Sequence, residues 1–266
     1  MREAWLRRTF FSVILLFMSA PLIVVTGVSL NAQKRLLFPP DGLSLRWYGE
    51  LLQQQEWLTP LYHSVLIAAL AALFALSVAL PLAYFLWRYR VRYAQALFAL
   101  GVAPFMLPPV ITALGLLSFW ITVGGYGQIG AVIISHGIFF VTLPLVTVSL
   151  GLEAIDRSVI EAARTLGADD RQVLRTVVLP LVRPYLISGY AFAFVLSLNE
   201  YIVAYMVAGF TVETLPIKIF NSLRYGYTPV MACVAVVFVL IAVLVFGLIG
   251  RYGNLPRLLG AWQDDE

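Results

Sequence analysis

Six apolar runs dominate the chain and limit the folds that it can adopt. They cover about residues 10–30, 61–87, 94–122, 127–150, 185–209 and 228–250. Each matches or exceeds the roughly 20 apolar residues that an α-helix needs to cross a bilayer. Only 12% of the 266 residues are charged, against about 25% in an average soluble domain. We therefore predict an all-α integral membrane protein with six transmembrane helices.

Positive charges indicate which side of the membrane each loop faces. With a cytoplasmic N-terminus, one side of a six-span chain receives the segments 1–9, 88–93, 151–184 and 251–266, which hold 13 of the 18 Lys and Arg residues. The other side receives Lys34, Arg35, Arg46, Lys218 and Arg224. Because cytoplasmic loops carry the excess of positive charge, both termini are predicted to be cytoplasmic.

The domain organisation follows from what separates the apolar runs. We find no internal repeat and no separate soluble segment, so we expect a single transmembrane domain over residues 1–266. The first apolar run is longer than the roughly 7–15 residues of a signal-peptide core, and we expect it to be retained. The single cysteine, Cys233, allows no intramolecular disulfide and is expected to serve packing.

Two further runs carry residues that affect helix geometry. Pro104, Pro108 and Pro109 fall inside 94–122, where they are expected to kink or break the helix. The small residues of "SGYAFAF", 188–194, are expected to permit close contact between helices.

The loop 151–184 is the polar interruption of the chain, and its residues predict a helix, a tight turn and a second helix. Ser158 and Glu161 have the spacing of a capping box, and Gly167 is placed to end the first helix in a left-handed conformation. Val159, Ile160, Ala163 and Leu166 are expected to share its apolar face.

The second helix of this loop is predicted to begin after Asp169. Gln172 follows three residues later, as in a capping box, and Pro180 and Pro184 are expected to end the helical pattern. A DNA-binding helix-turn-helix is excluded because membrane spans lie within a few residues on each side and leave no way to reach a major groove. A merely solvated loop and a docking element for a cytoplasmic partner remain open on local chemistry.

The pattern of residues 161–180 resembles a known family. It reads E-A-A, three residues, Gly167, nine residues, Val177, one residue, then Leu-Pro, which is similar to the EAA loop of binding-protein-dependent ABC importer permeases. Val177 stands where the family more often has isoleucine. The matched positions expected to couple to an ATPase are Glu161, Ala162, Ala163, Gly167, Leu179 and Pro180.

This resemblance implies the partners and the location of the chain. It implies a bacterial cytoplasmic (inner) membrane, a second homologous permease, two ATPase subunits and an external or periplasmic binding protein. The chain has no G-x-x-x-x-G-K-[ST] motif, so ATP and Mg²⁺ are expected in the partner ATPase rather than here. The loop is then a cytoplasmic coupling element between the fourth and fifth spans.

Glu200 is the only acidic residue inside an apolar run. A carboxylate there is costly in lipid, so it is expected to face the bundle interior or a water-filled cavity and to belong to the substrate path. A hydrogen-bonded glutamate that joins two helices remains the alternative. Asn199, Tyr201 and Tyr205 are further path candidates, with Ser197 and the two tyrosines on one helical face.

A second resemblance concerns the cargo. "SLNEYIVAYMVAG" and "TLPIKIFNSLRYGYTP" are similar to the fifth span and the following segment of spermidine/putrescine-type permeases, and "WYGELL" agrees with that branch. This implies a polyamine or a related small amine as cargo. Asn199 stands where an aspartate is common, which leaves smaller substrates such as aminobutyrate or aminoethylphosphonate open.

Other classes of function are less compatible with the residues. His63 and His136 are the only histidines, and Ser135 beside His136 points about 100° away on a helix, so enzyme chemistry and a metal site are not expected. We expect a hydrogen-bonded core histidine at 136. A secondary transporter or channel would also explain Glu200, but it would not explain the EAA loop and would normally show an inverted repeat.

Overall fold

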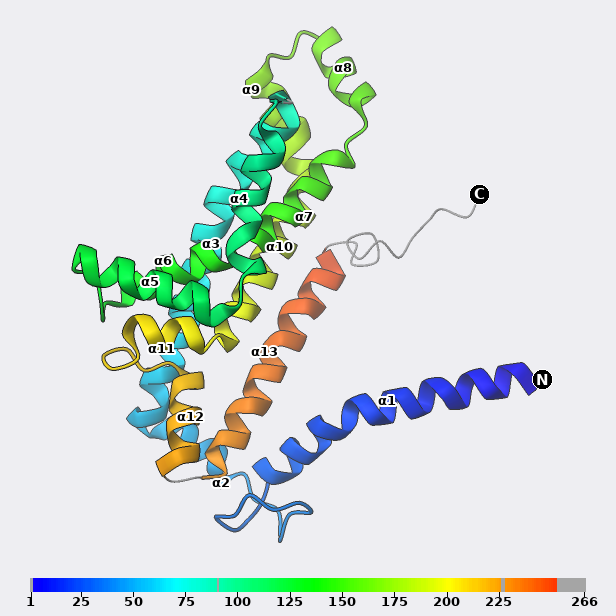
Figure 1. Ribbon diagram of the computed structural model, residues 1–266. Helices are drawn as coiled ribbons and strands as arrows, with labels where there is room; N and C mark the ends of the chain where they lie inside the picture. The colour runs from blue at the N-terminus through cyan, green and yellow to red at the C-terminus, as the bar shows by residue number, and fades with distance from the viewer. Residues whose placement is uncertain (1, 90, 226–227, 253–266) are drawn as a thin grey trace. The chain divides into compact units, whose positions relative to one another are not determined.

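The computed structural model describes residues 2–89, 91–225 and 228–252. Within them the regular structure is helical apart from one isolated bridge between Asn31 and Leu43, which confirms the predicted all-α chain (Figure 1). The C-terminal segment 253–266, predicted to be cytoplasmic, lies outside the described residues. The helices are α1 (Arg2–Ser29), α2 (Arg46–Gln53), α3 (Gln55–Tyr89), α4 (Ala94–Met106), α5 (Pro109–Val123), α6 (Ile129–Phe140), α7 (Thr142–Glu153), α8 (Arg157–Thr165), α9 (Asp170–Val173), a π-helical turn (Leu174–Val178), α10 (Leu179–Asn199), α11 (Ile202–Ala208), α12 (Leu215–Tyr225) and α13 (Val230–Tyr252).

The apolar helices are numerous enough for a membrane protein with several spans. Among the described residues, four helices are long and apolar enough to cross a bilayer: Trp5–Ser29, Gln55–Tyr89, Asp170–Asn199 and Val230–Gly247. Two bent pairs, α4 with α5 and α6 with α7, also pass when each pair is taken together, which raises the number to as many as six. In the first of these helices, an apolar window of 18 residues has none of them buried, as a lipid-facing helix would.

The chain forms two compact units. The first combines Met1–Leu61 with Lys218–Val243, and the second combines Tyr62–Ile217 with Leu244–Glu266. The prediction of a single domain over 1–266 stays a prediction.

The first unit is held by polar contacts around the end of α1. Trp47 Nε1 donates to the carbonyl of Asn31 over 2.7 Å, and the hydroxyls of Ser29 and Tyr48 lie 2.8 Å apart. Cys233 is a free, buried thiol with its Sγ 3.6 Å from the carbonyl oxygen of Ser29. The packing role predicted for this cysteine is confirmed.

The second unit is built on small residues that let its helices approach closely. Ala75, Ala79 and Ala83 form a buried stripe along α3, in the same apolar cluster as Leu145 and Leu152 of α7. On α10, a methyl group added at Gly189 would lie 2.7 Å from the backbone of Pro144, and Ala191 and Ala193 are buried as well. The close helix contact predicted for "SGYAFAF" is therefore confirmed.

The prolines of the run 94–122 break it. Helix α4 ends at Met106 and α5 begins at Pro109, and their axes differ by 102°. Pro108 has no backbone N–H for the carbonyl of Pro104, four residues earlier, and the hydroxyl of Thr112 donates to that carbonyl over 3.3 Å instead. The predicted break is confirmed, and a polar side chain compensates part of the disturbed helix.

The helix that contains most of the predicted fifth span, 185–209, has different limits at both ends. A continuous helical stretch already begins at Asp170 and ends at Asn199, where Glu200 adopts an extended conformation before α11. Pro180 and Pro184 do not end the helix. In an α-helix the ring of Pro180 would clash with the carbonyl of Thr176, but Thr176 lies in the π-helical turn, whose hydrogen bonds are shifted by one residue.

The π-helical turn also decides which residues face the core. Val173, Val178 and Val182 are all buried in one cluster. Residues 173 and 178 are five apart, which suits the i→i+5 spacing of a π-helix rather than that of an α-helix. The turn therefore lets buried residues of the short helix α9 and of the long helix α10 pack against the same apolar cluster.

Candidate functional site

The loop between α7 and α10 is the first candidate site, and its first helix begins differently from the prediction. Asp156, and not Ser158, is the N-cap of α8: its carboxylate accepts from the backbone N–H of Ser158 over 2.9 Å. A carboxylate is favoured there because it both accepts a hydrogen bond and complements the positive end of the helix dipole. That backbone hydrogen bond lowers the pKa of Asp156.

Helix α8 ends where the sequence predicts. Gly167 has a φ of 89°, its N–H donates to the carbonyl of Arg164, and the N–H of Ala168 donates to the carbonyl of Ala163. These two bonds form a Schellman motif, which requires a left-handed residue at Gly167. The predicted tight turn is confirmed.

The second helix of the loop also begins as predicted. The Asp169 carboxylate accepts from the N–H of Gln172 over 2.7 Å, and the Gln172 side chain accepts from the N–H of Asp169 over 3.1 Å. The capping box is therefore complete.

The loop presents a mixed surface. Glu161, Ala162, Gly167 and Pro180 are exposed, whereas Ala163 and Leu179 are half-buried. Ile160 and Ala163 pack against the apolar cluster of α3 and α7. The predicted apolar face is wrong for the other two residues, because Val159 is 45% and Leu166 89% exposed.

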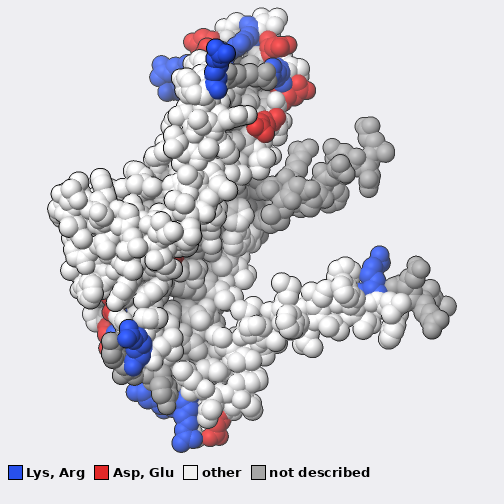
Figure 2. Space-filling view, in the orientation of Figure 1, with Lys and Arg blue, Asp and Glu red and all other residues white. Residues whose placement is uncertain are grey.

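The reason for this difference is where the helix ends. Leu166 follows the last residue of α8, so helical spacing no longer sets its direction. Val159 lies next to Ile160 and therefore points about 100° away from it. The loop thus exposes two apolar side chains beside its charged residues, and Figure 2 shows acidic and basic residues gathered at this end of the second unit.

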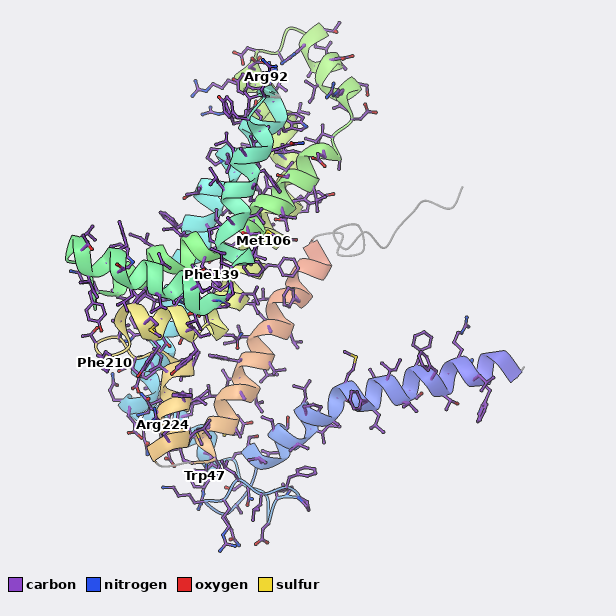
Figure 3. The ribbon with its side chains drawn as sticks, in the orientation of Figure 1. Trp47, Arg92, Met106, Phe139, Phe210 and Arg224 are labelled. Carbon is purple, nitrogen blue, oxygen red and sulfur yellow. The ribbon has the colours of Figure 1, made fainter. Side chains whose placement is uncertain are left out.

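An ion-pair network connects the loop to α3. The Asp170 carboxylate lies 2.7 Å from Arg164 of α8 and 3.4 Å from Arg88 of α3. A cavity of about 260 Å³ lies beside it, between α3, α8 and α9. Arg157 and Glu161 also line this cavity, together with Tyr84, Trp87, Ile160, Val173 and Val178. Arg92, which follows α3, lies at the same end of this unit (Figure 3).

Glu200 is the second candidate site, and it occupies the break between α10 and α11. Its Oε1 accepts from the N–H of Val203 over 2.8 Å and its Oε2 from the N–H of Ala204 over 3.0 Å. The side chain is 8% exposed. The prediction that it faces the protein interior is confirmed, and both oxygens contact groups of the protein itself.

His136 of α6 is a partner of Glu200 that the sequence did not reveal. Its Nε2 lies 3.1 Å from Oε2 of Glu200, at ion-pair distance but without the direction of a good hydrogen bond. Its Nδ1 lies 2.7 Å from the hydroxyl of Ser197. The predicted hydrogen-bonded core histidine is confirmed, but its contact with Glu200 joins positions too distant in sequence for local spacing to indicate.

The other path candidates are only partly brought together. The Tyr201 and Tyr205 rings stack with centroids 5.4 Å apart. Asn199 is exposed, and its amide donates to the carbonyl of Val195. Ser197 does not share a helical face with the tyrosines, because α10 ends at Asn199 and α11 begins at Ile202.

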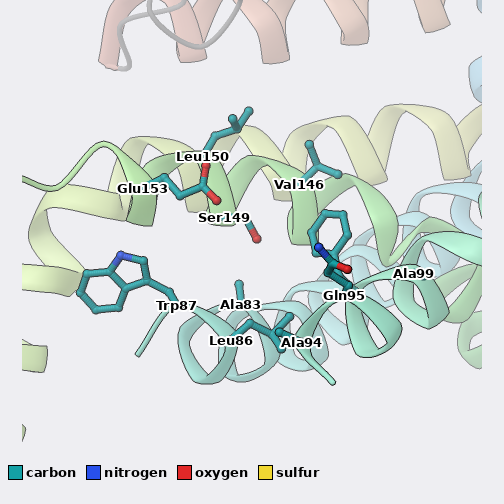
Figure 4. A pocket seen from close by; sticks show the side chains of 11 residues that line it. Ala83, Leu86, Trp87, Ala94, Gln95, Ala99, Val146, Ser149, Leu150 and Glu153 are labelled. Carbon is teal, nitrogen blue, oxygen red and sulfur yellow. The ribbon is translucent and has the colours of Figure 1, made fainter. Parts of the chain in front are cut away.

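A larger cavity lies elsewhere in the second unit. It has a volume of about 420 Å³ and opens between α3, α4 and α7 (Figure 4). Its walls are mostly apolar, with Gln95, Ser149 and Glu153 as polar groups. None of the predicted site residues lines it. Among the described residues, no group of three or more His, Cys, Asp or Glu side chains is placed to hold a metal ion.

Comparison with known families gives one match over most of the chain. The family model described as "Binding-protein-dependent transport system inner membrane component" matches residues 75–253.

Two curated relatives are similar over nearly the full length. The spermidine/putrescine transport system permease protein PotC of Haemophilus influenzae is 32% identical over 257 residues, which cover 96% of this chain and 100% of the relative. The putrescine transport system permease protein PotI of Escherichia coli is 35% identical over 257 residues, covering 94% of this chain and 89% of the relative.

Solved structures share the fold. A chain of a bacterial ABC transporter involved in the import of the acidic polysaccharide alginate has a TM-score of 0.71 at 19% identity, covering 94% of this chain and 96% of that one. A chain of the MetNI methionine ABC transporter, in an inward-facing conformation, has a TM-score of 0.63 at 18% identity, covering 77% and 96%.

Proposed function

Because this chain belongs to the family of binding-protein-dependent transport system inner membrane components, we propose that it is the permease subunit of an ATP-driven ABC importer for a polyamine or a related small amine. It forms half of the translocation path with a second, homologous permease. An external binding protein delivers the cargo, and two ATPase subunits, which hold ATP and Mg²⁺, supply the energy.

Six spans with both termini in the cytoplasm are the topology that we propose. Four long apolar helices and two bent apolar pairs support this number. The excess of Lys and Arg in 1–9, 88–93, 151–184 and 251–266 supports the orientation. In this topology the loop of α8 and α9 lies on the cytoplasmic side of the bacterial inner membrane, where the ATPase subunits bind.

The loop between α7 and α10 is the proposed ATPase-docking element, and its shape is the observation that carries the functional proposal. A nine-residue helix, closed by Gly167 and followed at once by the capped helix α9, forms a compact projection at one end of the second unit (Figure 1). The exposed Glu161, Ala162 and Leu166 are available for contact with a partner. Ala162 lets that partner approach the α8 backbone closely.

The cargo proposal rests on the relatives and on the residues near the break. Both relatives described above are named as permeases of putrescine or spermidine/putrescine systems. Tyr201 and Tyr205 supply aromatic faces that attract a cation. Asn199 adds an exposed amide beside Glu200. Aminobutyrate and aminoethylphosphonate remain the alternative cargoes, because the external binding protein contributes much of the selectivity.

The test uses the full complex of both permeases, both ATPases and the cognate binding protein, reconstituted in liposomes. ATP hydrolysis is measured across a panel of putrescine, spermidine, aminobutyrate and aminoethylphosphonate. We expect a polyamine to stimulate ATP hydrolysis by the complete complex. Uptake of that polyamine into the liposomes should stop when the ATPase subunits are omitted. Uptake that continues without ATPase subunits would overturn the importer proposal, and stimulation by another member of the panel alone would replace the cargo.

The matched variant for the path is Glu200→Gln in the same complex. Loss of polyamine stimulation in this variant, with assembly of the complex and its basal ATP hydrolysis unchanged, would support a carboxylate charge in the cation path. Unchanged stimulation would remove Glu200 from the path and leave it as the joint between α10 and α11.

A further inference from the structure

Three charged side chains from three helices meet at the base of the loop. Asp170 opens α9 and lies within 2.7 Å of Arg164, near the end of α8, and within 3.4 Å of Arg88, near the end of α3. Arg88 and Arg164 come from parts of the chain far apart in sequence. A single carboxylate therefore joins the docking helix to a helix that belongs to the membrane-spanning part.

Helix α8 has few other attachments to the second unit. None of its residues is buried, and only Ile160 and Ala163 pack against the apolar cluster. A cavity of about 260 Å³ separates part of α8 from Tyr84 and Trp87 of α3. Close packing therefore does not fix α8 against α3 along its whole length, and the ion pairs of Asp170 bridge the two helices beside the cavity.

The three residues have the geometry of a link rather than of a ligand site. Both carboxylate oxygens of Asp170 face guanidinium groups, so the single negative charge is shared between two arginines. The exposed fraction of the side chain is 34% for Arg88, 44% for Arg164 and 68% for Asp170. Water and salt weaken such pairs in the free chain, but coverage by a docked partner would strengthen them by excluding water.

We propose that Asp170 is a positioning residue that, through Arg164 and Arg88, transmits movement of the loop helix α8 to helix α3. The inference rests on the proposed function, because it assigns a route for the force that ATP-driven closure applies to the loop. Without the link, α8 would move with the ATPase across the cavity beneath it, and less of that movement would reach α3.

The test measures the number of ATP molecules hydrolysed per polyamine transported, in the complete importer reconstituted in liposomes. Asp170→Asn keeps the size of the side chain and removes its charge. We expect this variant to retain binding of the ATPase subunits and substrate-stimulated hydrolysis, and to raise the ATP-to-substrate ratio by up to about fivefold, the upper end for an exposed ion pair.

Asp169→Asn is the matched control. It also removes one carboxylate from the start of α9, but asparagine caps helices as well as aspartate, and Asp169 bonds Gln172 rather than the two arginines. Its ratio should equal that of the wild type. Asp170→Glu, which restores the charge, should recover most of the coupling.

Arg88→Gln provides an independent route to the same link and carries the test if Asp170→Asn does not assemble. It should raise the ratio in the same direction, and the double variant should be no worse than the more affected single variant, because both changes break one network. Ratios that match the wild type in both single variants, or strictly additive effects in the double variant, would overturn the link. ATP-independent uptake by the wild type would instead overturn the proposed function itself.

Discussion

The Nε2 atom of His136 lies 3.1 Å from Oε2 of Glu200, so a side chain of α6 contacts the residue at which α10 gives way to α11. His136 is held in turn by Ser197, whose hydroxyl lies 2.7 Å from Nδ1. The break in the fifth apolar run is thus fixed by side chains on both sides, and Glu200 acts there as a structural joint whatever else it does.

Removal of the Glu200 side chain should destabilise this joint. Glu200→Ala leaves the N–H groups of Val203 and Ala204 without their acceptors, at a cost of about 1–3 kcal/mol for each buried donor left unpaired. Thermal unfolding of the purified permease complex should show a clear loss. Asn199→Ala removes only an exposed amide bonded to Val195 and serves as the control. Equal losses in the two variants would contradict the joint.

The left-handed turn of the loop gives a second prediction. Gly167→Ala introduces a side chain at a φ of 89°, although space is free around it, so the cost is backbone strain of about 1 kcal/mol or more. Hydrogen exchange of the α8 amides should become faster. Gly115→Ala, in open space inside α5, should be neutral or stabilising by up to about 1 kcal/mol. Unchanged exchange in Gly167→Ala would refute the Schellman motif.

The N-cap of α8 should make this helix sensitive to acid. The backbone hydrogen bond from Ser158 lowers the pKa of Asp156 below its ordinary value of 3.8. Its contribution to stability is therefore complete above pH 3.8 and is lost as the pH falls through the lowered folded-state pKa. Hydrogen exchange of α8 across this range checks it. Asp156→Asn keeps the cap but does not titrate, so the acid-dependent part of the stability of α8 that Asp156 supplies should disappear. An identical pH profile of exchange in the variant and the wild type would contradict this prediction.

The close approach of α7 and α10 gives a fourth prediction. Gly189→Ala would place a methyl group 2.7 Å from the Pro144 backbone, and overpacking of this kind costs about 1–3 kcal/mol. The melting temperature of the complex should fall. Gly130→Ala, where nothing lies within 4 Å of the added carbon, is the matched control. A fall of the same size in both variants would mean that helix contact is not the cause.

The sequence predicted those features that depend on local chemistry. The turn at Gly167 and the capping box of Asp169 and Gln172 follow from residues within a few positions of one another, and both are confirmed. The break between Met106 and Pro109 follows from proline geometry in the same way. Apolar composition was sufficient to predict an all-helical membrane protein.

The features that the sequence did not predict depend on tertiary structure or on competition between neighbours. Asp156 replaced Ser158 as the cap because both are capping residues two positions apart, and the carboxylate is the stronger acceptor. The pairs His136 with Glu200 and Arg88 with Asp170 join distant segments that spacing cannot connect. The end of α10 at Asn199 was missed because apolar residues resume directly after Glu200, so two polar residues did not mark an end of the run.

The π-helical turn Leu174–Val178 has a consequence for how the length of this loop can vary. Exposed connections usually accept an added or missing residue, because nothing downstream depends on their count. Here the π-helical turn holds one residue more than a regular α-helix would need, and its loss would leave Val173 and Val178 four residues apart, still on one helical face. A second deletion would turn Val173 away by about 100°. Across related chains, the length from Asp169 to the end of the turn should therefore differ by no more than this one residue.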